Sequence, residues 1–161
     1  MPIGETPILE VIIKKLAKCG FDHITITVNH MADIIKAFFG DGSKWNLKID
    51  YSLEDKPLST MGPLKLIKDL PENFLIMNGD VLTDLDYDSF YSWHVKSGAI
   101  YTISSYERTH INDYGVLEIN DTDHLTAFRE KPSTSFKVSM GVYMASNRIL
   151  DYIPYNQAYG F

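Results

Sequence analysis

The sequence predicts an α/β layered fold with a mostly parallel sheet, and two observations carry this prediction. Patterns typical of strands and of helices alternate along the chain as far as residue 105, which is the arrangement of parallel strands joined by crossover helices. The segment Asn73–Met77 is mostly a continuous apolar run of strand length. Such a run is typical of a central parallel strand that is covered on both faces.

The first part of the chain supplies these elements in alternation. Apolar residues at helical spacing between Pro7 and Gly20 predict a helix over residues 7–18. His23–Val28 is rich in β-branched residues and predicts a strand. The elements predicted next are a helix at Met31–Phe39 that ends before Gly40, a strand at Leu47–Tyr51 and a short helix at Pro63–Leu70.

Beyond the apolar strand, the pattern changes from alternation to strands alone. A helix at Asp86–Lys96 and a strand at Ala99–Ser105 complete the alternating part. The later elements predicted are strands at Gly115–Ile119, Leu125–Arg129 and Val138–Ala145, a turn at Asn120–Asp123, and the start of a helix at Ile149–Ile153. We interpret this later part as a β-rich insertion or extension.

The alternation opens with a helix, although the first strand of a doubly wound fold is often central and the turn after it holds phosphates. We therefore expect an opening strand and its loop to precede residue 1. No linker or low-complexity tract divides the sequence, so residues 1–161 are expected to form one partial domain.

The composition limits the classes of partner. The 161 residues include 15 basic and 21 acidic side chains, a formal net charge of −6, so the chain lacks the basic footprint of a non-specific nucleic-acid binder. No uncharged apolar run has the ~18–20 residues that span a bilayer. The single cysteine, Cys19, cannot form an intramolecular disulfide, which favours a reducing compartment. We expect a cytoplasmic protein that binds neither nucleic acid nor membrane.

The segment Asn78-Gly79-Asp80 directly follows the apolar strand. Ligands of open α/β sheets bind beyond the carboxyl ends of the strands, so Asp80 is well placed to face a site. One carboxylate at such a place can hold Mg²⁺ together with substrate phosphates and waters. The alternative is that Asn-Gly-Asp only forms a tight turn.

A second candidate site, Glu130-Lys131-Pro132, follows the predicted strand Leu125–Arg129. The carboxylate of Glu130 can accept hydrogen bonds from hydroxyl groups, and the ammonium group of Lys131 can neutralise a phosphate. The pair would therefore suit a ligand that carries both groups. The alternative is an exposed strand end that is stopped by proline.

The segments that stand out, taken together, resemble the sugar-phosphate nucleotidyltransferases, also called nucleotide-sugar pyrophosphorylases. In family order along the chain they are Pro2–Leu9, Asp41–Tyr51, Glu54–Leu64, Asn78–Asp80, Tyr114–Val116, Glu130–Pro132 and Met140–Tyr143. The third segment is similar to the family's Glu-x-x-Pro-Leu-Gly-Thr-x-Gly loop, with Ser59 in place of the first Gly. The resemblance covers nearly the whole chain and corresponds to the central part of the catalytic domain.

This resemblance implies a Rossmann-like α/β domain that joins a nucleoside triphosphate to a sugar 1-phosphate and releases pyrophosphate, with Mg²⁺ as cofactor. It implies that Asp80 holds the metal and that Asp80 and Lys131 are catalytic. The substrate-binding residues that it implies are Glu54, Pro57, Leu58, Ser59 and Thr60 at the nucleotide, Gly79 beside Asp80, Gly115 and Glu130 at the sugar, Lys131 at its phosphate, and Ser139 where Asn is frequent.

Two parts of the family's pattern would lie outside this sequence. The Gly-rich signature loop with its Arg and Lys would precede residue 1, and a late Asp that completes the metal site would follow Phe161. We therefore expect the first strand and the Gly-rich loop to be lacking, and residues 1–161 alone to be inactive and to self-associate through an uncovered sheet edge.

The identity of the substrates follows less directly from the sequence. The loop Pro57–Leu64 most resembles guanylyltransferases of the mannose-1-phosphate type, which favours guanylyl transfer. The alternative function is that of a non-catalytic relative that binds a nucleotide sugar and regulates a partner.

Overall fold

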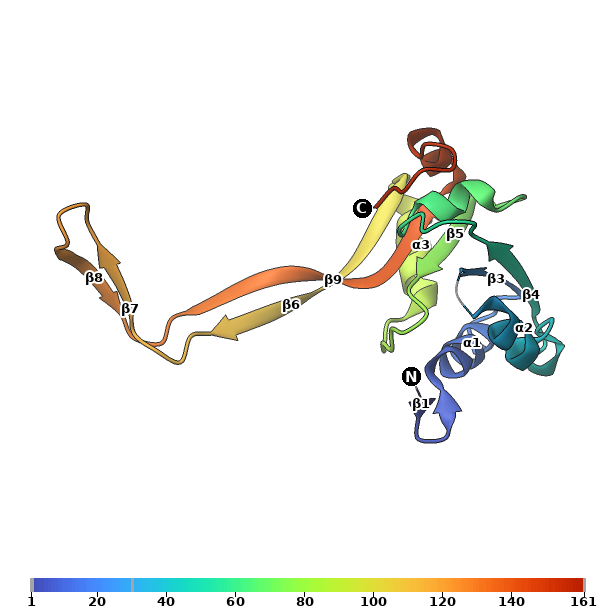
Figure 1. The fold of residues 1–161 in the computed structure, drawn as a ribbon, viewed down its shortest axis with the longest axis horizontal. Helices are drawn as coiled ribbons and strands as arrows, with labels where there is room; N and C mark the ends of the chain where they lie inside the picture. The colour runs from blue at the N-terminus through green and yellow to red at the C-terminus, as the bar shows by residue number, and fades with distance from the viewer. Residues whose placement is uncertain (1, 30, 161) are drawn as a thin grey trace. The chain divides into compact units, whose positions relative to one another are not determined.

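Two short strands, β1 (Pro2–Ile3) and β2 (Thr6–Pro7), form an antiparallel pair ahead of helix α1 (Ile8–Lys18) (Figure 1). The computed structural model describes residues 2–29 and 31–160. The predicted helix over residues 7–18 is confirmed. It begins one residue later than predicted, directly after Pro7, and ends at Lys18 as predicted.

The chain divides into two units. The first unit contains the residues up to Ile103 together with those from Gly141 onward, and the second unit contains Ser104–Met140. Strands β6 (Tyr101–Ile111) and β9 (Ser133–Ser146) contribute residues to both units. Both strands are longer than the sequence predicted, and the additional residues other than Ser146 belong to the second unit.

The first unit begins with a parallel pair of strands. Strand β3 (His23–Val28) pairs in parallel with β4 (Lys48–Leu53) along its whole length. Helix α2 (Ala32–Phe39) and the 3-10 turn η1 (Ser43–Trp45) lie between the two strands in sequence. The strand–helix–strand order and the parallel pairing confirm the α/β class that the alternating pattern predicted.

A second sheet in this unit has the strand order β5-β9-β6. Strand β5 (Asn73–Met77) has the predicted bounds, and apolar clusters cover both of its faces, as predicted: Phe74 and Ile76 pack in one cluster, and Leu75 and Met77 pack in another. The prediction that it is a central parallel strand is wrong. It pairs antiparallel with β9, and no other strand of the described residues pairs with it. Because one edge is open, only Phe74 is buried, and Leu75, Ile76 and Met77 remain half-buried.

Helix α1 supplies apolar side chains to two separate parts of the core. Ile12 and Leu16 pack with Tyr87 and Val142, and Ile13 packs with residues of α2 and β4. A further cluster contains Met61, Leu64, Phe74, Ala145 and Ile153. The core of the first unit therefore joins segments that lie far apart in the sequence.

Helix α3 (Tyr87–Ser97) begins after Asp86, the first residue of the helix predicted at Asp86–Lys96. The carboxylate of Asp86 caps the helix and accepts from the backbone N–H of Ser89 at 3.2 Å. The Ser89 hydroxyl donates to it at 2.6 Å and lowers the pKa of Asp86 below its usual value. Within the helix, buried His94 has its Nδ1 atom 2.7 Å from the hydroxyl oxygen of Thr102.

Two predicted helices form only short 3-10 segments, η2 (Gly62–Leu66) and η3 (Asn147–Tyr152). The first ends early because the backbone of Ile67 is extended, with a ψ of 124°, and Asp69 beyond it has a positive φ of 59°. The second ends at Ile153, which is extended because Pro154 follows it. No helix in the described ranges combines the length and the apolar character that crossing a membrane requires.

The second unit contains an antiparallel hairpin of β7 (Val116–Ile119) and β8 (Leu125–Arg129). The side-chain oxygen of Asn120 accepts from the backbone N–H groups of Thr122 at 3.1 Å and His124 at 2.9 Å. These bonds form the turn between the strands, at the position that the sequence predicted.

Candidate functional site

The Asn78-Gly79-Asp80 segment lies at the carboxyl end of β5 and forms a turn. The backbone N–H of Asn78 donates to the carbonyl of Gly141 in β9 at 3.0 Å, and the N–H of Val81 donates to the Asn78 carbonyl at 3.4 Å. The side chain of Asp80 is exposed. The structure therefore places this carboxylate beyond the end of a strand, where the sequence predicted it.

Gly141 supports this turn from the neighbouring strand. Its φ is +73°, and a Cβ atom there would lie 2.9 Å from Asn78 Nδ2 and 3.1 Å from Val81 Cγ2. A side chain at residue 141 would therefore strain the backbone and displace the side chain of Asn78. Gly141 lies in the segment Met140–Tyr143 that resembles the family, and an isolated glycine inside a strand indicates such an approach.

Lys15 of α1 holds the segment that follows Asp80. Its ammonium group donates to the carbonyl oxygens of Thr83 at 2.5 Å and Leu85 at 3.3 Å, and lies 4.8 Å from the centre of the Tyr87 ring. Sequence reasoning missed this contact, because no local pattern links a helical lysine to carbonyl groups 68 and 70 residues away.

Glu54 follows β4, and its carboxylate closes the loop that runs from Glu54 to Leu58. Its Oε2 atom accepts from the backbone N–H of Leu58 at 3.0 Å, and its carbonyl accepts from the Asn29 side chain at 3.1 Å. Its backbone N–H donates to the carbonyl of Val28 at 3.0 Å. The half-buried carboxylate therefore has a partner within the chain and shapes the loop at residues 57–60.

Some of the predicted substrate-binding residues in this loop are exposed to solvent, and another is buried. Pro57, Ser59 and Thr60 are exposed, but Leu58 is only 1% exposed, so its side chain belongs to the core. The carbonyl of Leu58 accepts from the backbone N–H of Tyr159 at 3.0 Å, which ties the loop to the last residues of the first unit. Ser59 has a positive φ of 62°, a conformation that glycine adopts more readily.

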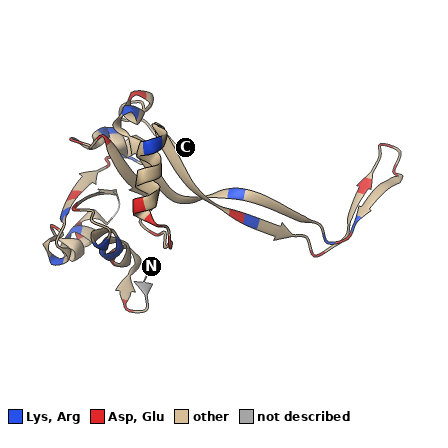
Figure 2. Cartoon of the chain, turned by 180° about the vertical axis from the view of Figure 1, so that it is seen from behind, with Lys and Arg blue, Asp and Glu red and all other residues tan. Residues whose placement is uncertain are grey.

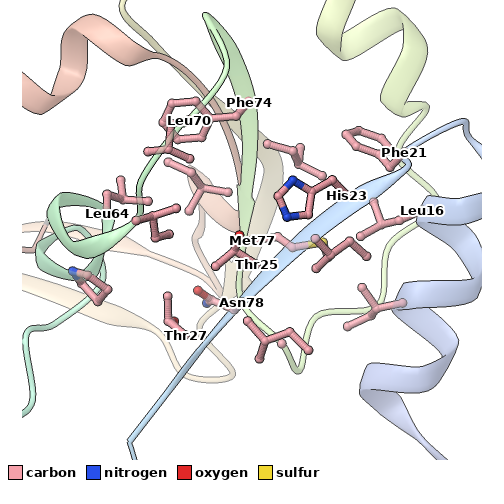
Figure 3. A pocket seen from close by; sticks show the side chains of 18 of the residues that line it. Leu16, Phe21, His23, Thr25, Thr27, Leu64, Leu70, Phe74, Met77 and Asn78 are labelled. Atoms are coloured by element: carbon pink, nitrogen blue, oxygen red, sulfur yellow. The ribbon is translucent and has the colours of Figure 1, made fainter. Parts of the chain in front are cut away.

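A cavity of about 820 Å³ lies between β3 and β5 in the first unit (Figure 3). Leu16 of α1 and Leu64 of η2 lie on opposite sides of Met77 in this view. Three predicted site residues also line the cavity, namely Ser59, Thr60 and Gly79. The structure thus brings the loop after β4 and the turn after β5 to one cavity.

In the second unit, the structure brings Gly115 and Glu130 together. A Cβ atom on Gly115 would lie 2.5 Å from Phe128 Cζ and 3.4 Å from Glu130 Oε2. The ring of Phe128 would therefore have to shift to admit a Cβ atom at this position, independently of any ligand. The exposed Glu130 carboxylate lies beside this small residue.

Lys131 and Ser139 lie in the same unit and are exposed. Lys131 has a positive φ of 41°, so the chain turns sharply where β8 has ended. The carbonyl of Pro132 accepts from the backbone N–H of Asn112 at 3.0 Å. This bond fixes the turn that presents the Lys131 side chain.

Charged side chains are dispersed over the elements of both units, as Figure 2 shows. Neither β3 nor β5 contains Lys, Arg, Asp or Glu, whereas α1 carries Lys14, Lys15 and Lys18. Among the residues that the structure describes, no three His, Cys, Asp or Glu side chains lie close enough together to hold a metal ion.

Comparison with known proteins identifies the family. The profile of the family described as nucleotidyl transferase matches residues 1–159. The chain is 32% identical to a UTP–glucose-1-phosphate uridylyltransferase of Synechocystis, over 99% of this chain and 46% of that protein. It is 27% identical to a mannose-1-phosphate guanylyltransferase of Mycobacterium tuberculosis, over 96% of this chain and 44% of that protein.

A solved structure also matches the fold. The crystal structure of HddC from Yersinia pseudotuberculosis complexed with GMP-PN has a TM-score of 0.74 and 25% identity, over 100% of this chain and 72% of that chain. The chain spans less than half the length of the two curated relatives named above. The family match covers nearly all of these residues, and the chain belongs to the nucleotidyl transferase family, as its resemblance to the sugar-phosphate nucleotidyltransferases indicated.

Proposed function

We propose that this chain is the central part of an enzyme that transfers a nucleotidyl group from a nucleoside triphosphate to a sugar 1-phosphate. The observation that carries the proposal is the exposed carboxylate of Asp80 at the carboxyl end of β5, in a chain of this family. An oxygen of the sugar phosphate attacks the α-phosphorus, and pyrophosphate leaves. Catalysis of such a step depends on positioning and on neutralisation of charge.

Asp80 is suited to bind Mg²⁺ that arrives with the triphosphate. Magnesium ions are held by one or two carboxylates together with substrate phosphates and waters. The Asp80 side chain is exposed, and no hydrogen bond from the described residues reaches its carboxylate. Bound Mg²⁺ would polarise the phosphate and neutralise charge on the leaving pyrophosphate.

The cavity that is lined by Gly79, the residue before Asp80, supports a nucleotide site in the first unit. Ser59, Thr60 and Gly79 line it with small or hydroxylated groups, and Glu54 and Pro57 lie in the same loop. The proposed role of Glu54 is to hold the loop through the backbone of Leu58, because its carboxylate accepts that N–H. Leu58 would contribute through its backbone alone.

In the second unit, Gly115, Glu130, Lys131 and Ser139 are the proposed sugar-phosphate residues. Glu130 would accept hydrogen bonds from sugar hydroxyls, and Lys131 would bind the phosphate. The exposure of both side chains and the adjacency of Gly115 to Glu130 support this assignment.

Guanylyl transfer is the nucleotide specificity that we propose. The relative from M. tuberculosis and one from Aneurinibacillus thermoaerophilus are named as guanylyltransferases, and the HddC structure was solved with GMP-PN. The Synechocystis relative is named as a uridylyltransferase, so a comparison of nucleotides is needed.

The test is a binding and turnover panel with the 161-residue chain. Calorimetry would measure the binding of GTP, UTP, dTTP and ATP, each with and without Mg²⁺, and of mannose 1-phosphate and glucose 1-phosphate. We expect saturable binding that is tightest for GTP and depends on Mg²⁺. We expect no pyrophosphate release from these residues alone. Failure of every triphosphate to bind would contradict the proposal.

A further inference from the structure

Asn78-Gly79 is the only Asn-Gly pair in the sequence. Asparagine is a thermally labile residue, because the backbone nitrogen of the next residue can attack its side-chain carbonyl carbon and displace ammonia. A Cβ atom on that next residue hinders the attack, and glycine carries none. Each of the other seven asparagines is followed by a residue with a Cβ atom. The sequence therefore distinguishes Asn78 from all of them.

The structure leaves the reacting groups of this pair accessible. Asn78 and Gly79 are exposed and lie just after β5. Within residues 2–29 and 31–160, neither the side-chain amide of Asn78 nor the backbone N–H of Gly79 forms a hydrogen bond. Both residues line the cavity of about 820 Å³, where Figure 3 shows the Asn78 amide, so water can reach them. Because no hydrogen bond holds the amide, it can turn toward the Gly79 nitrogen.

The two asparagines that precede aspartate are, in contrast, held by their side chains. The side-chain oxygen of Asn120 accepts from the backbone N–H groups of Thr122 at 3.1 Å and His124 at 2.9 Å. The side-chain oxygen of Asn112 accepts from the backbone N–H of Tyr114 at 3.1 Å. Each of these bonds holds the side-chain carbonyl in its turn and opposes the rotation that the attack requires.

Asp41-Gly42 is the one Asp-Gly pair of the sequence, and aspartate can form the same cyclic imide. The Asp41 carboxylate accepts from the backbone N–H of Ser43 at 3.0 Å. This hydrogen bond lowers the pKa of Asp41 below its usual value, so the group stays ionised at neutral pH. A carboxylate resists attack by nitrogen, because it is negatively charged and lacks a good leaving group. The amide of Asn78 has neither protection.

We propose that Asn78 is a site of spontaneous deamidation. The Gly79 nitrogen forms a bond to Cγ of Asn78, the bond between Cγ and Nδ2 breaks, and the proton of the Gly79 nitrogen leaves with Nδ2 as ammonia. Water then adds to one of the two carbonyl carbons of the cyclic imide, and the carbon–nitrogen bond at that carbon breaks. Opening at the main-chain carbon gives isoaspartate, and opening at Cγ gives aspartate. No oxidant or reductant takes part.

The products change the turn that carries Asp80. Either product places a new carboxylate, ionised at neutral pH, two residues before Asp80. Isoaspartate also adds a carbon atom to the main chain and removes from it the Asn78 carbonyl, which accepts from the N–H of Val81 at 3.4 Å. Asp80 is therefore expected to move relative to Gly141, which holds the start of the turn. The effect on a metal site at Asp80 rests on the proposed function, whereas the deamidation itself does not.

The first test is peptide mass spectrometry of the 161-residue chain during incubation at neutral pH, with and without guanidinium chloride. The rate of amide loss in denaturant is the rate of each asparagine without the fold. We expect folding to leave the Asn78 rate nearly unchanged and to slow Asn112 and Asn120 several-fold. Electron-transfer fragmentation identifies isoaspartate at residue 78. An Asn78 that folding slows as strongly as Asn120, or that does not deamidate, would overturn the proposal.

Gly79→Ala tests the role of the attacking nitrogen. A Cβ atom at residue 79 would lie 3.7 Å from Leu9 Cδ1, which is an ordinary van der Waals contact, so the variant should fold normally. Its methyl group hinders the attack, and we expect deamidation at Asn78 to be several-fold slower. Gly98→Ala is the control, because Gly98 follows α3 and no atom lies within 4 Å of its added Cβ. Equal rates at Asn78 in the two variants would contradict cyclisation through Gly79.

Calorimetry of freshly prepared and deamidated chain connects the modification with Asp80. The gain that Mg²⁺ gives to GTP binding should be present in the fresh chain and lost in the fraction that contains isoaspartate. Equal gains in both would overturn the predicted displacement of Asp80. If the fresh chain binds no GTP, the proposed function fails, whereas the mass spectra still decide whether Asn78 deamidates.

Discussion

The backbone N–H of Asn78 donates to the carbonyl of Gly141 at 3.0 Å, and this bond fixes the turn that carries Asp80 to strand β9. Gly141 has a φ of +73°, and a Cβ atom at residue 141 would lie 2.9 Å from the side-chain nitrogen of Asn78. We infer that the position of Asp80 depends on glycine at residue 141.

Gly141→Ala is therefore expected to lower the free energy of unfolding by about 2–3 kcal/mol, because it adds a backbone strain and a steric clash. Gly98→Ala is the matched control: Gly98 also has a positive φ, of +64°, but no atom lies within 4 Å of its added Cβ. Its cost should be about 1 kcal/mol. Urea denaturation of both variants measures the difference, and equal losses would show that the close approach to Asn78 has no importance.

Glu54 offers a test between a structural role and a ligand-binding role. Glu54→Gln retains an oxygen that can accept the N–H of Leu58, whereas Glu54→Ala removes it. If the carboxylate holds the loop, the alanine variant should lose about 1–3 kcal/mol of stability and bind GTP more weakly. The glutamine variant should resemble the unsubstituted chain in both measurements. A glutamine variant as defective as the alanine variant would show that the charge itself is required.

Lys131→Ala is expected to weaken the binding of mannose 1-phosphate by about tenfold or more, since a charged hydrogen bond to phosphate is lost. GTP binding should change much less. Lys137→Ala is the control, because Lys137 is another exposed lysine of the second unit. Calorimetric titration of both ligands distinguishes the cases, and an equal loss for both ligands would indicate that Lys131 is structural.

His94 predicts a pH dependence of stability. Burial lowers the pKa of His94 below its usual value of 6.5, so the unfolded chain binds a proton at a higher pH than the folded chain. Stability from this residue is therefore present above pH 6.5 and is lost as the pH falls below that value.

The measurement is the free energy of unfolding of the unsubstituted chain and of His94→Gln at pH 7.5 and 5.5. The unsubstituted chain should lose more stability between these pH values, by up to about 1.4 kcal/mol per pH unit. His124→Gln provides the control, because His124 is exposed and should leave the dependence unchanged. Identical pH profiles for the unsubstituted chain and His94→Gln would contradict the assignment.

Local patterns predicted many of the elements well. The strands His23–Val28, Asn73–Met77 and Leu125–Arg129 have the predicted bounds, because β-branched or apolar runs between turn residues determine them locally. The same applies to the position of Asp80 after β5. Local patterns could not predict that β5 would have only one paired neighbour among the described residues.

The contacts that shape the site depend on distant segments and escaped prediction. Lys15 reaches the carbonyl of Thr83 across 68 residues of sequence, and nothing near Lys15 indicates this partner. Leu58 belongs to a loop that the family resemblance assigned to the nucleotide, yet tertiary packing buries its side chain. Such outcomes follow from the packing of the whole unit rather than from spacing.

The most direct test of the proposed function is the Mg²⁺ dependence of GTP binding to the 161-residue chain and to its Asp80→Asn variant. Asp84→Asn is the control, because Asp84 is an exposed carboxylate of the adjoining segment. If Asp80 holds the metal, Mg²⁺ should strengthen GTP binding to the unsubstituted chain and to Asp84→Asn by about tenfold or more. Asp80→Asn should show no such gain, although its circular dichroism is unchanged. A full gain from Mg²⁺ in Asp80→Asn would contradict the proposed metal site.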